Sequence, residues 1–249
     1  MFKVKLENAG TFKRCIDALN TLIDEGKFII NEKGMTLTAM SPSQIAMVDF
    51  KIPKTAFSEY DVDGENEVGI NLNDLNDRTR RSRSGDSLEI SLGESDSRLK
   101  LVFKGKIKRT FDLPLLDLTE DTPNEPAVDF NSELKINGTI FKENLKDANL
   151  VSSHVVLKLA PQKFEIKAKG DKGTLHTEID KEDDVILDYK SNEEQRAMFP
   201  LEYMNNLLTG VSSDSIVTLN LKNDAPLKLK YGIGNTTLTY YLAPRVEEQ

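Results

Sequence analysis

The chain has 249 residues, with 33 Lys and Arg against 41 Asp and Glu, so its formal net charge is −8. This length allows one large domain or two of ordinary size, and the negative charge argues against a non-specific nucleic-acid binder unless bases gather on one surface. No run approaches the ~20 apolar residues of a membrane span, and the first ten residues lack the apolar segment of a signal peptide, so we expect no membrane partner. The single cysteine, Cys15, excludes an internal disulfide and favours a reducing compartment.

The first half of the chain begins with apolar residues at helical spacing. They predict a helix over residues 9–24, and Cys15 lies in the same apolar stripe, which favours core packing over a role as nucleophile. Segments such as VDFKI alternate apolar and polar residues with period two, which predicts strands. A further helix is expected over residues 71–85, followed by the strands LEISL and LKLVF.

A segment typical of linkers follows. LTEDTPNEPAVDF, residues 118–130, is rich in acidic residues and proline and predicts a connector between two domains. Beyond it, helical spacing predicts a helix over residues 138–151. Another helix follows Pro200, which is a favourable first helical residue, and ends at Gly210.

The two halves repeat one pattern. The hairpin that begins SGDSLEISL in the first half corresponds to the one that begins SSDSIVTLN in the second, so that Leu99 matches Leu227 and Phe103 matches Tyr231. Earlier elements match in the same order at nearly the same offset, which favours two similar domains. We therefore predict an α+β fold of antiparallel sheets with helices packed on one face. Residues 1–117 form the first domain, 118–130 the connector and 131–249 the second domain.

No motif indicates an enzyme. The chain has two histidines, His154 and His176, with no cysteine near either in sequence, and it lacks the P-loop, zinc-protease and nucleophile-elbow patterns. The acidic run from Asp180 to Asp184 has residues suited to a hard metal ion, but a solvated loop is the favoured interpretation. We expect no catalytic residue, no cofactor and no metal, and a metal-dependent two-domain enzyme remains an unfavoured alternative.

Bases gather on the expected helices. Each taken singly fits ordinary solvated helix surface, but three of the four helices carry them away from their own sheets, and together they predict a basic face. These candidates for contact with nucleic acid are Lys13, Arg14, Arg80, Arg81, Arg83, Lys142 and Lys146.

Two motifs resemble a known family. GMTLTAMSPSQIAMVDFKIPKTAF, residues 34–57, and YYLAPR, residues 240–245, resemble signatures of the archaeal-type sliding clamps of the proliferating cell nuclear antigen family. The length and the repeat fit as well, so the resemblance covers the whole chain. It implies a homotrimeric ring whose helices line a central hole around double-stranded DNA. The bound sequence would not matter, because contacts to phosphates carry no sequence information.

The same resemblance implies a DNA polymerase processivity factor for DNA replication and repair. Its expected partners are DNA polymerase, the clamp loader, flap endonuclease, DNA ligase and further copies of itself. We expect it in the cytoplasm, associated with the chromosome, or in the nucleus if the source is eukaryotic. An obligate subunit of a heterotrimeric clamp is the open alternative.

A docking pocket for partner peptides is also implied. Members of the family bind a short peptide through the C-terminal segment, the loop after the signature strand and the connector. For Leu242, simple closure of the domain core stays open as an alternative. Carried over by motif, the pocket residues are Met40, Gln44, Ile45, Met47, Leu118, Pro123, Pro126, Pro226, Tyr241, Leu242, Ala243 and Pro244.

The subunit joint is implied to be a pairing of edge strands. In the family, the strand that corresponds to KIKRTFDLP in one copy pairs with the strand that corresponds to GTLHTEID in the next copy. Both strands would otherwise be exposed sheet edges, which readily pair with another strand. The residues assigned to this joint are Arg81, Arg83, Phe111, Glu143, Asp147, Thr174, His176 and Ile179. The chain departs from the family pattern at Ser41, at Gln44 and in the polar connector.

Overall fold

The computed structural model describes residues 1–94, 96–119 and 122–245, and the chain divides into two units. The first unit comprises Met1–Pro42, Val48–Pro123 and Ile233–Leu238. The second comprises Ser43–Met47, Asn124–Gly232 and Thr239–Gln249. Residues 43–47 thus belong to the second unit, and residues 233–238 belong to the first.

The first unit holds two helices and a series of antiparallel strands. A single 3₁₀ turn, Lys54–Ala56, follows the fourth strand, and that strand begins in the segment assigned to the second unit. The elements are β1 (Phe2–Leu6), α1 (Ala9–Asn20), β2 (Glu25–Asn31), β3 (Gly34–Met40), β4 (Ala46–Pro53), β5 (Glu59–Val62), β6 (Asn66–Asn71), α2 (Leu72–Thr79), β7 (Ser87–Leu92), β8 (Arg98–Lys104) and β9 (Lys108–Pro114).

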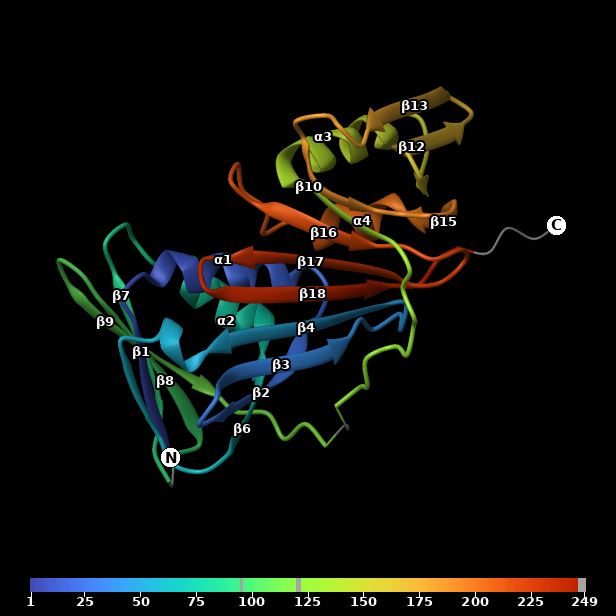
Figure 1. The fold of residues 1–249 in the computed structure, drawn as a ribbon. Coiled ribbons are helices and arrows are strands. Elements are labelled where there is room, and N and C mark those ends of the chain that lie inside the picture. Colours follow the sequence, from blue (N-terminus) through green and yellow to red (C-terminus); the bar gives the residue numbers. More distant parts are fainter. Residues whose placement is uncertain (95, 120–121, 246–249) are drawn as a thin grey trace. The chain divides into compact units, whose positions relative to one another are not determined.

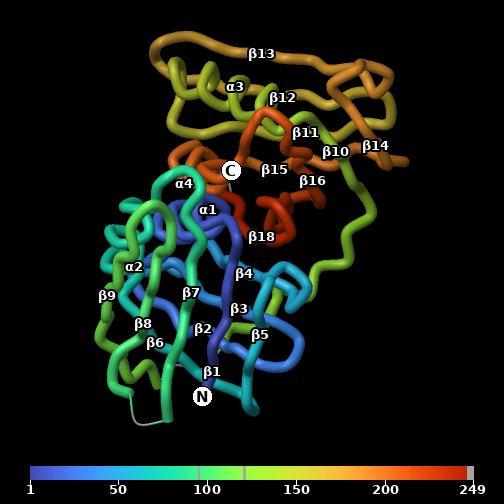
Figure 2. Tube along the Cα trace, turned by 90° about the vertical axis from the view of Figure 1, so that its left-hand side faces the viewer, coloured from blue at the N-terminus to red at the C-terminus, as the bar shows by residue number. Residues whose placement is uncertain are grey.

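The strands of the first unit form two arrays. One is a five-stranded sheet in the order β5-β1-β7-β8-β9, which Figure 2 shows from β5 across to β9. The other contains β4, β3, β2 and β6 in that order. Gly34 starts β3 with φ of 147°, and a Cβ there would lie 2.2 Å from the carbonyl oxygen of Ile52, so this position of the signature segment needs glycine.

Both helices of the first unit are shorter than the sequence predicts. α1 begins where the Asn8 side chain accepts from the Gly10 N–H, and it ends at Asn20 instead of continuing to residue 24. Its apolar stripe, which includes Cys15, is buried as predicted. Burial also raises the pKa of the Cys15 thiol to about 12, which keeps it protonated and unreactive.

The prediction of a helix over residues 71–85 is wrong in its second half. α2 ends at Thr79, so Arg80 is its C-cap, and Arg81 and Arg83 lie in the turns beyond it. Asp86 explains this end: its carboxylate accepts from the Arg83 N–H at 2.8 Å and pairs with Arg109 of β9. Because Asp86 and Arg109 are distant in sequence, helical periodicity does not predict the contact between them.

The second unit repeats the pattern of strands and paired helices. Figure 1 shows α3 lying against β12 and β13. The elements are β10 (Glu133–Asn137), α3 (Gly138–Asn149), β11 (His154–Ala160), β12 (Lys163–Gly170), β13 (Gly173–Asp180), β14 (Ile186–Lys190), β15 (Gln195–Pro200), α4 (Leu201–Leu207), β16 (Ile216–Asn220), β17 (Leu227–Ile233) and β18 (Thr236–Leu242). The last strand, β18, is divided between the two units.

The sheets of the second unit are again antiparallel. β13, β12, β11 and β15 form a four-stranded sheet in that order, and β14, β10, β16 and β17 lie next to one another in another array. Apolar side chains such as Phe164, Ile166 and Phe199 alternate inward and are buried. The sequence predicts ends at residue 151 for α3 and residue 210 for α4, and both helices end slightly earlier. The predicted α+β class, with antiparallel sheets and four helices, is confirmed.

Candidate peptide-docking and DNA-facing surfaces

The C-terminal segment is fixed inside the second unit. Tyr240, Tyr241 and Leu242 are buried at the end of β18, so the apolar tail packs and does not fray. The Ala243 N–H donates to the carbonyl oxygen of Ile45 at 2.8 Å, and the Arg245 N–H donates to that of Met198 at 2.8 Å. These two backbone hydrogen bonds hold the segment between residues 43–47 and β15.

Tyr241 connects this segment to the connector. Its hydroxyl donates to a carboxylate oxygen of Glu125 at 2.7 Å, and the Nζ of Lys228 lies 5.4 Å from the centre of its ring. The side chain of Tyr241 is almost fully buried. Glu125 is therefore a connector residue in direct contact with a residue of the predicted pocket.

The other residues assigned to the pocket differ in exposure. Gln44 is exposed and has φ of 59°, a left-handed backbone that is uncommon for a non-glycine residue. Met47 and Leu242 are fully buried and belong to the core beneath the surface. In the second unit Ile45, Pro126, Pro226, Ala243 and Pro244 are half-buried, and in the first unit Met40 is exposed and Leu118 and Pro123 are half-buried.

In the first unit the candidate DNA-facing bases lie at α1 and after α2. Arg80 donates from Nε to the carboxylate of Asp17 at 2.9 Å, which joins the end of α2 to α1. Arg81 and Arg83 are exposed, and they support the turn through their backbone groups. On α1, Arg14 is exposed and Lys13 is half-buried.

In the second unit the candidate bases both lie on α3, but their surroundings differ. Lys146 pairs with Glu143 at 2.7 Å, and both side chains are more than half exposed. Lys142 donates from Nζ to the carbonyl oxygen of Leu208 at 3.0 Å, joining α3 to the end of α4. Burial lowers the pKa of Lys142, and the charge of Lys146 lowers it further. Lys142 is thus partly committed to holding the two helices together.

The strands assigned to the subunit joint both lie at sheet edges. β9 ends the five-stranded sheet, and β13 ends the four-stranded sheet. Thr174 and His176 are exposed on β13, and Glu143 and Asp147 are exposed on α3. The rings of Phe111 and Phe103 meet edge-on with their centroids 5.9 Å apart, and Ile179 is 6% exposed, so the side chain of Ile179 packs in its own unit.

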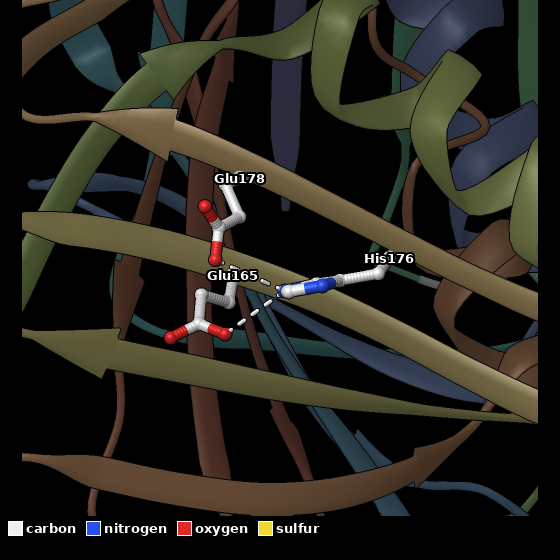
Figure 3. A group of neighbouring side chains, drawn as sticks. All are labelled: Glu165, His176 and Glu178. Carbon is white, nitrogen blue, oxygen red and sulfur yellow. Dashed lines mark hydrogen bonds and ion pairs between the residues drawn. The ribbon is translucent and has the colours of Figure 1, made fainter.

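Two carboxylates and an imidazole, from Glu165, Glu178 and His176, form a cluster on β12 and β13 (Figure 3). Glu165 of β12 contacts the Nε2 of His176 at 3.0 Å, and the same nitrogen lies 3.3 Å from Glu178. Three ammonium groups also surround Glu165, from Lys158, Lys163 and Lys167. Because these cations already neutralise the carboxylate, the cluster fits an ion-pair network and not a metal site.

Ionisation of Glu165 depends on those partners. Its burial opposes ionisation, but hydrogen bonds from Lys167 and His176 and the charge of Lys158 lower its pKa from 4.5 to about 2. Sequence reasoning missed this residue. The available signal was a carboxylate between Lys163 and Lys167 at a spacing of two residues, which places all three side chains on one face of a strand.

Comparison with known proteins covers both halves of the chain. Residues 1–123 match the family model described as proliferating cell nuclear antigen, N-terminal domain, and residues 124–246 match the C-terminal domain of the same antigen. The chain belongs to the proliferating cell nuclear antigen family of sliding clamps. The family predicted from residues 34–57 and 240–245 is therefore confirmed.

Relatives in this family are similar over nearly their full length. The DNA polymerase sliding clamp of Pyrococcus horikoshii is 32% identical, and that of Thermococcus sibiricus is 34% identical, each alignment covering 99% of both chains. The sliding-clamp function inferred from the sequence is confirmed by these relatives.

Solved structures of clamps from this family have the same fold as this chain. The clamp antigen of Thermococcus kodakaraensis superposes with a TM-score of 0.94 at 26% identity, covering 98% of this chain and all of that one. A clamp of A. fulgidus, solved with the C-terminal region of FEN-1 bound, superposes with a TM-score of 0.91 at 25% identity over both full chains. In the described residues, no helix combines the length and hydropathy needed to cross a membrane.

Proposed function

We propose that this chain is the subunit of a homotrimeric ring that encircles duplex DNA and tethers replication enzymes through a peptide-docking pocket. The observation that carries the proposal is the anchored C-terminal segment. Ala243 is hydrogen-bonded to the loop at Ile45, and Tyr241 is hydrogen-bonded to the connector. These are the same elements by which the family is expected to grip a peptide, and a relative of the same fold is described as a complex with the C-terminal region of FEN-1.

The chain acts as a scaffold and not as an enzyme in this proposal. Its pocket binds one short peptide at a time, so a DNA polymerase, the clamp loader, a flap endonuclease and a DNA ligase compete for it. Half-buried Ile45, Pro126, Ala243 and Pro244 supply the apolar contact, since a few well-packed anchors usually carry such an interface. With domains at residues 1–117 and 131–249, the connector at residues 118–130 contributes to this pocket.

Sliding on DNA depends on weak contacts to phosphates. The exposed guanidinium groups of Arg81 and Arg83, with Lys146, are suited to such contacts because electrostatic attraction to the duplex is independent of its sequence. Lys146, Lys142 and Arg80 contribute less than the two arginines, because each already has a protein partner. The ring carries out this role with the chromosome in the cytoplasm, or in the nucleus of a eukaryote.

Assembly proceeds through β9 of one copy and β13 of the next. Both strands end their sheets, and an unpaired edge presents a row of backbone donors and acceptors. Ion pairs from Arg81 and Arg83 to Glu143 and Asp147 of the neighbour add little, since exposed pairs contribute about 0–1 kcal/mol each.

Light scattering on the purified chain tests the assembly. The expected mass is three times 28.0 kDa at micromolar concentration and low salt. A monomer under these conditions contradicts the homotrimer, and recovery of a trimer only with a second clamp chain instead establishes a heterotrimer. A substitution in β13, His176→Pro, removes a backbone donor that the alternating ladder directs to the open edge of the sheet and should release monomers; His176→Gln is the matched control that keeps the backbone.

A further inference from the structure

A hollow of about 1730 Å³ lies on one face of the four-stranded sheet of the second unit. Its floor is a row of side chains that the strand register places side by side, from His176 to Lys167 to Val156 to Met198. The loop at residues 149–154 and the hairpin at residues 170–174 form its walls. Thr174 and His176, at its edge, are also assigned to the subunit joint, and pairing of β13 through its backbone edge leaves the rest of this face open.

The lining of the hollow is strongly basic in a chain whose net charge is −8. Among the described residues, Asp171 is the one carboxylate that lines it. Lys169 and Lys172 have no hydrogen-bond or ion-pair partner within the described ranges, so their ammonium groups are available. The bases that line the hollow are Lys167, Lys169, Lys172, Arg196 and Arg245.

Arg245 connects the hollow to the docking segment. It follows Pro244 directly, its N–H donates to the carbonyl oxygen of Met198 on the floor, and its guanidinium Nη1 lies 3.0 Å from Nε2 of His154. Burial lowers the pKa of His154, and the charge of Arg245 lowers it further, which favours the neutral imidazole beside the guanidinium. Residues 241–244 are therefore joined directly to a residue that lines the hollow.

The floor also distinguishes between kinds of ligand. Val156 and Met198 give it an apolar part, and Leu150 at its wall is 71% exposed. A phosphate backbone gains nothing from these groups, whereas a peptide with both carboxylates and apolar side chains matches the basic walls and the apolar floor.

We infer that the hollow is a second subsite, which binds an acidic segment flanking the docking motif of a partner protein. The inference rests on the proposed docking of peptides at residues 241–244. The acidic flank pairs with Lys169, Lys172 and Arg245, so the subsite selects among partners that carry the same docking motif but different flanking charge.

Calorimetry with extended peptides tests the inference. The probe is the C-terminal FEN-1 peptide with either four Glu or four Gln added at one end, and both ends are tried. Three exposed charge pairs should make the Glu version bind roughly fivefold more tightly at low salt, and the difference should vanish at about 0.5 M salt. The double variant Lys169→Gln/Lys172→Gln should lose most of this preference while its affinity for the Gln version is unchanged.

The control is Lys100→Gln/Lys106→Gln, which removes the same charge from exposed lysines of the first unit and should keep the preference. Equal binding of Glu and Gln versions at both ends overturns the inference while the docking proposal stands, and so does a preference that survives in the Lys169/Lys172 variant. If no version of the peptide binds the wild-type chain, the docking proposal itself is wrong and the inference falls with it.

Discussion

Replacing Glu125 by isoleucine should strengthen the binding of partner peptides. In the free chain, the Tyr241 hydroxyl donates to the Glu125 carboxylate at 2.7 Å, and the Tyr241 side chain is 4% exposed. A peptide that displaces the connector from Tyr241 has to break this hydrogen bond. It also has to leave the carboxylate beside an apolar surface. Isoleucine removes both costs and adds apolar contact.

The free energy of this hydrogen bond determines how much the affinity for the peptide should increase. An intramolecular hydrogen bond contributes about 0.5–1.5 kcal/mol net. Glu125 is exposed, so the lower part of that range applies and the expected gain in affinity is about two- to fivefold, given that 1.4 kcal/mol corresponds to tenfold. Tyr241→Phe removes the same hydrogen bond from the other side but keeps the carboxylate, so it should give a smaller gain than Glu125→Ile. Glu125→Gln keeps an acceptor and should give less.

Calorimetry measures the affinity of the C-terminal FEN-1 peptide for the wild type, Glu125→Ile, Tyr241→Phe and Glu125→Gln. The double variant Glu125→Ile/Tyr241→Phe should bind no more tightly than the better single variant, because each change removes the same bond. If Glu125→Ile and Tyr241→Phe both bind the peptide with wild-type affinity, the hydrogen bond between Tyr241 and Glu125 does not oppose docking. The connector then does not cover Tyr241 when the peptide binds. Weaker binding in both means that the bond organises the pocket.

Three further outcomes are expected. Changing Ala243 and Pro244 together to Gln should cost roughly 2–4 kcal/mol of peptide binding in calorimetry, as for true interface anchors, and leave the assembled mass unchanged; wild-type affinity identifies the tail as core closure alone. Arg81→Ala with Lys146→Ala should weaken retention on DNA. The slope of the logarithm of the DNA-binding constant against the logarithm of the salt concentration should become less steep by up to about 0.9 for each phosphate that is no longer neutralised. An unchanged slope would mean that these bases do not contact the DNA. The pKa of Glu165 is about 2 in the folded chain and 4.5 ordinarily, so its ionised form contributes stability that is complete above about pH 4.5 and is lost as the pH falls towards 2. In Glu165→Gln the thermal unfolding midpoint should therefore fall less steeply with pH over this interval than in the wild type. An equally steep fall in the variant contradicts the ion-pair network.

Much of the fold was predictable because its signals are local. The apolar stripe around Cys15 and the alternating strands specify which face of each element is buried, and residues 34–57 and 240–245 identify the family. What the sequence could not give are contacts between distant residues. Asp86 ends α2 early through Arg109 of β9, and no helical spacing records such a contact.

The candidate site shows the same division. The tail at residues 240–245 was assignable by motif, but its contact with Glu125 joins residues 116 positions apart and depends on the path of the connector. Ile179 and Leu242 were assigned to surfaces, yet both are buried, because alternation predicts which residues share a face and not which face meets a partner. The sequence presents Lys142 as a free base, whereas its acceptor, the carbonyl of Leu208, lies on another element.

Retention on circular DNA tests the central claim most directly. The chain is loaded onto a closed circle by a clamp loader, washed at moderate salt, and the circle is then cut once. A ring that encircles the duplex should stay on the closed circle and leave within minutes once free ends exist. Equal retention before and after the cut contradicts encirclement and assigns the bases to ordinary surface binding.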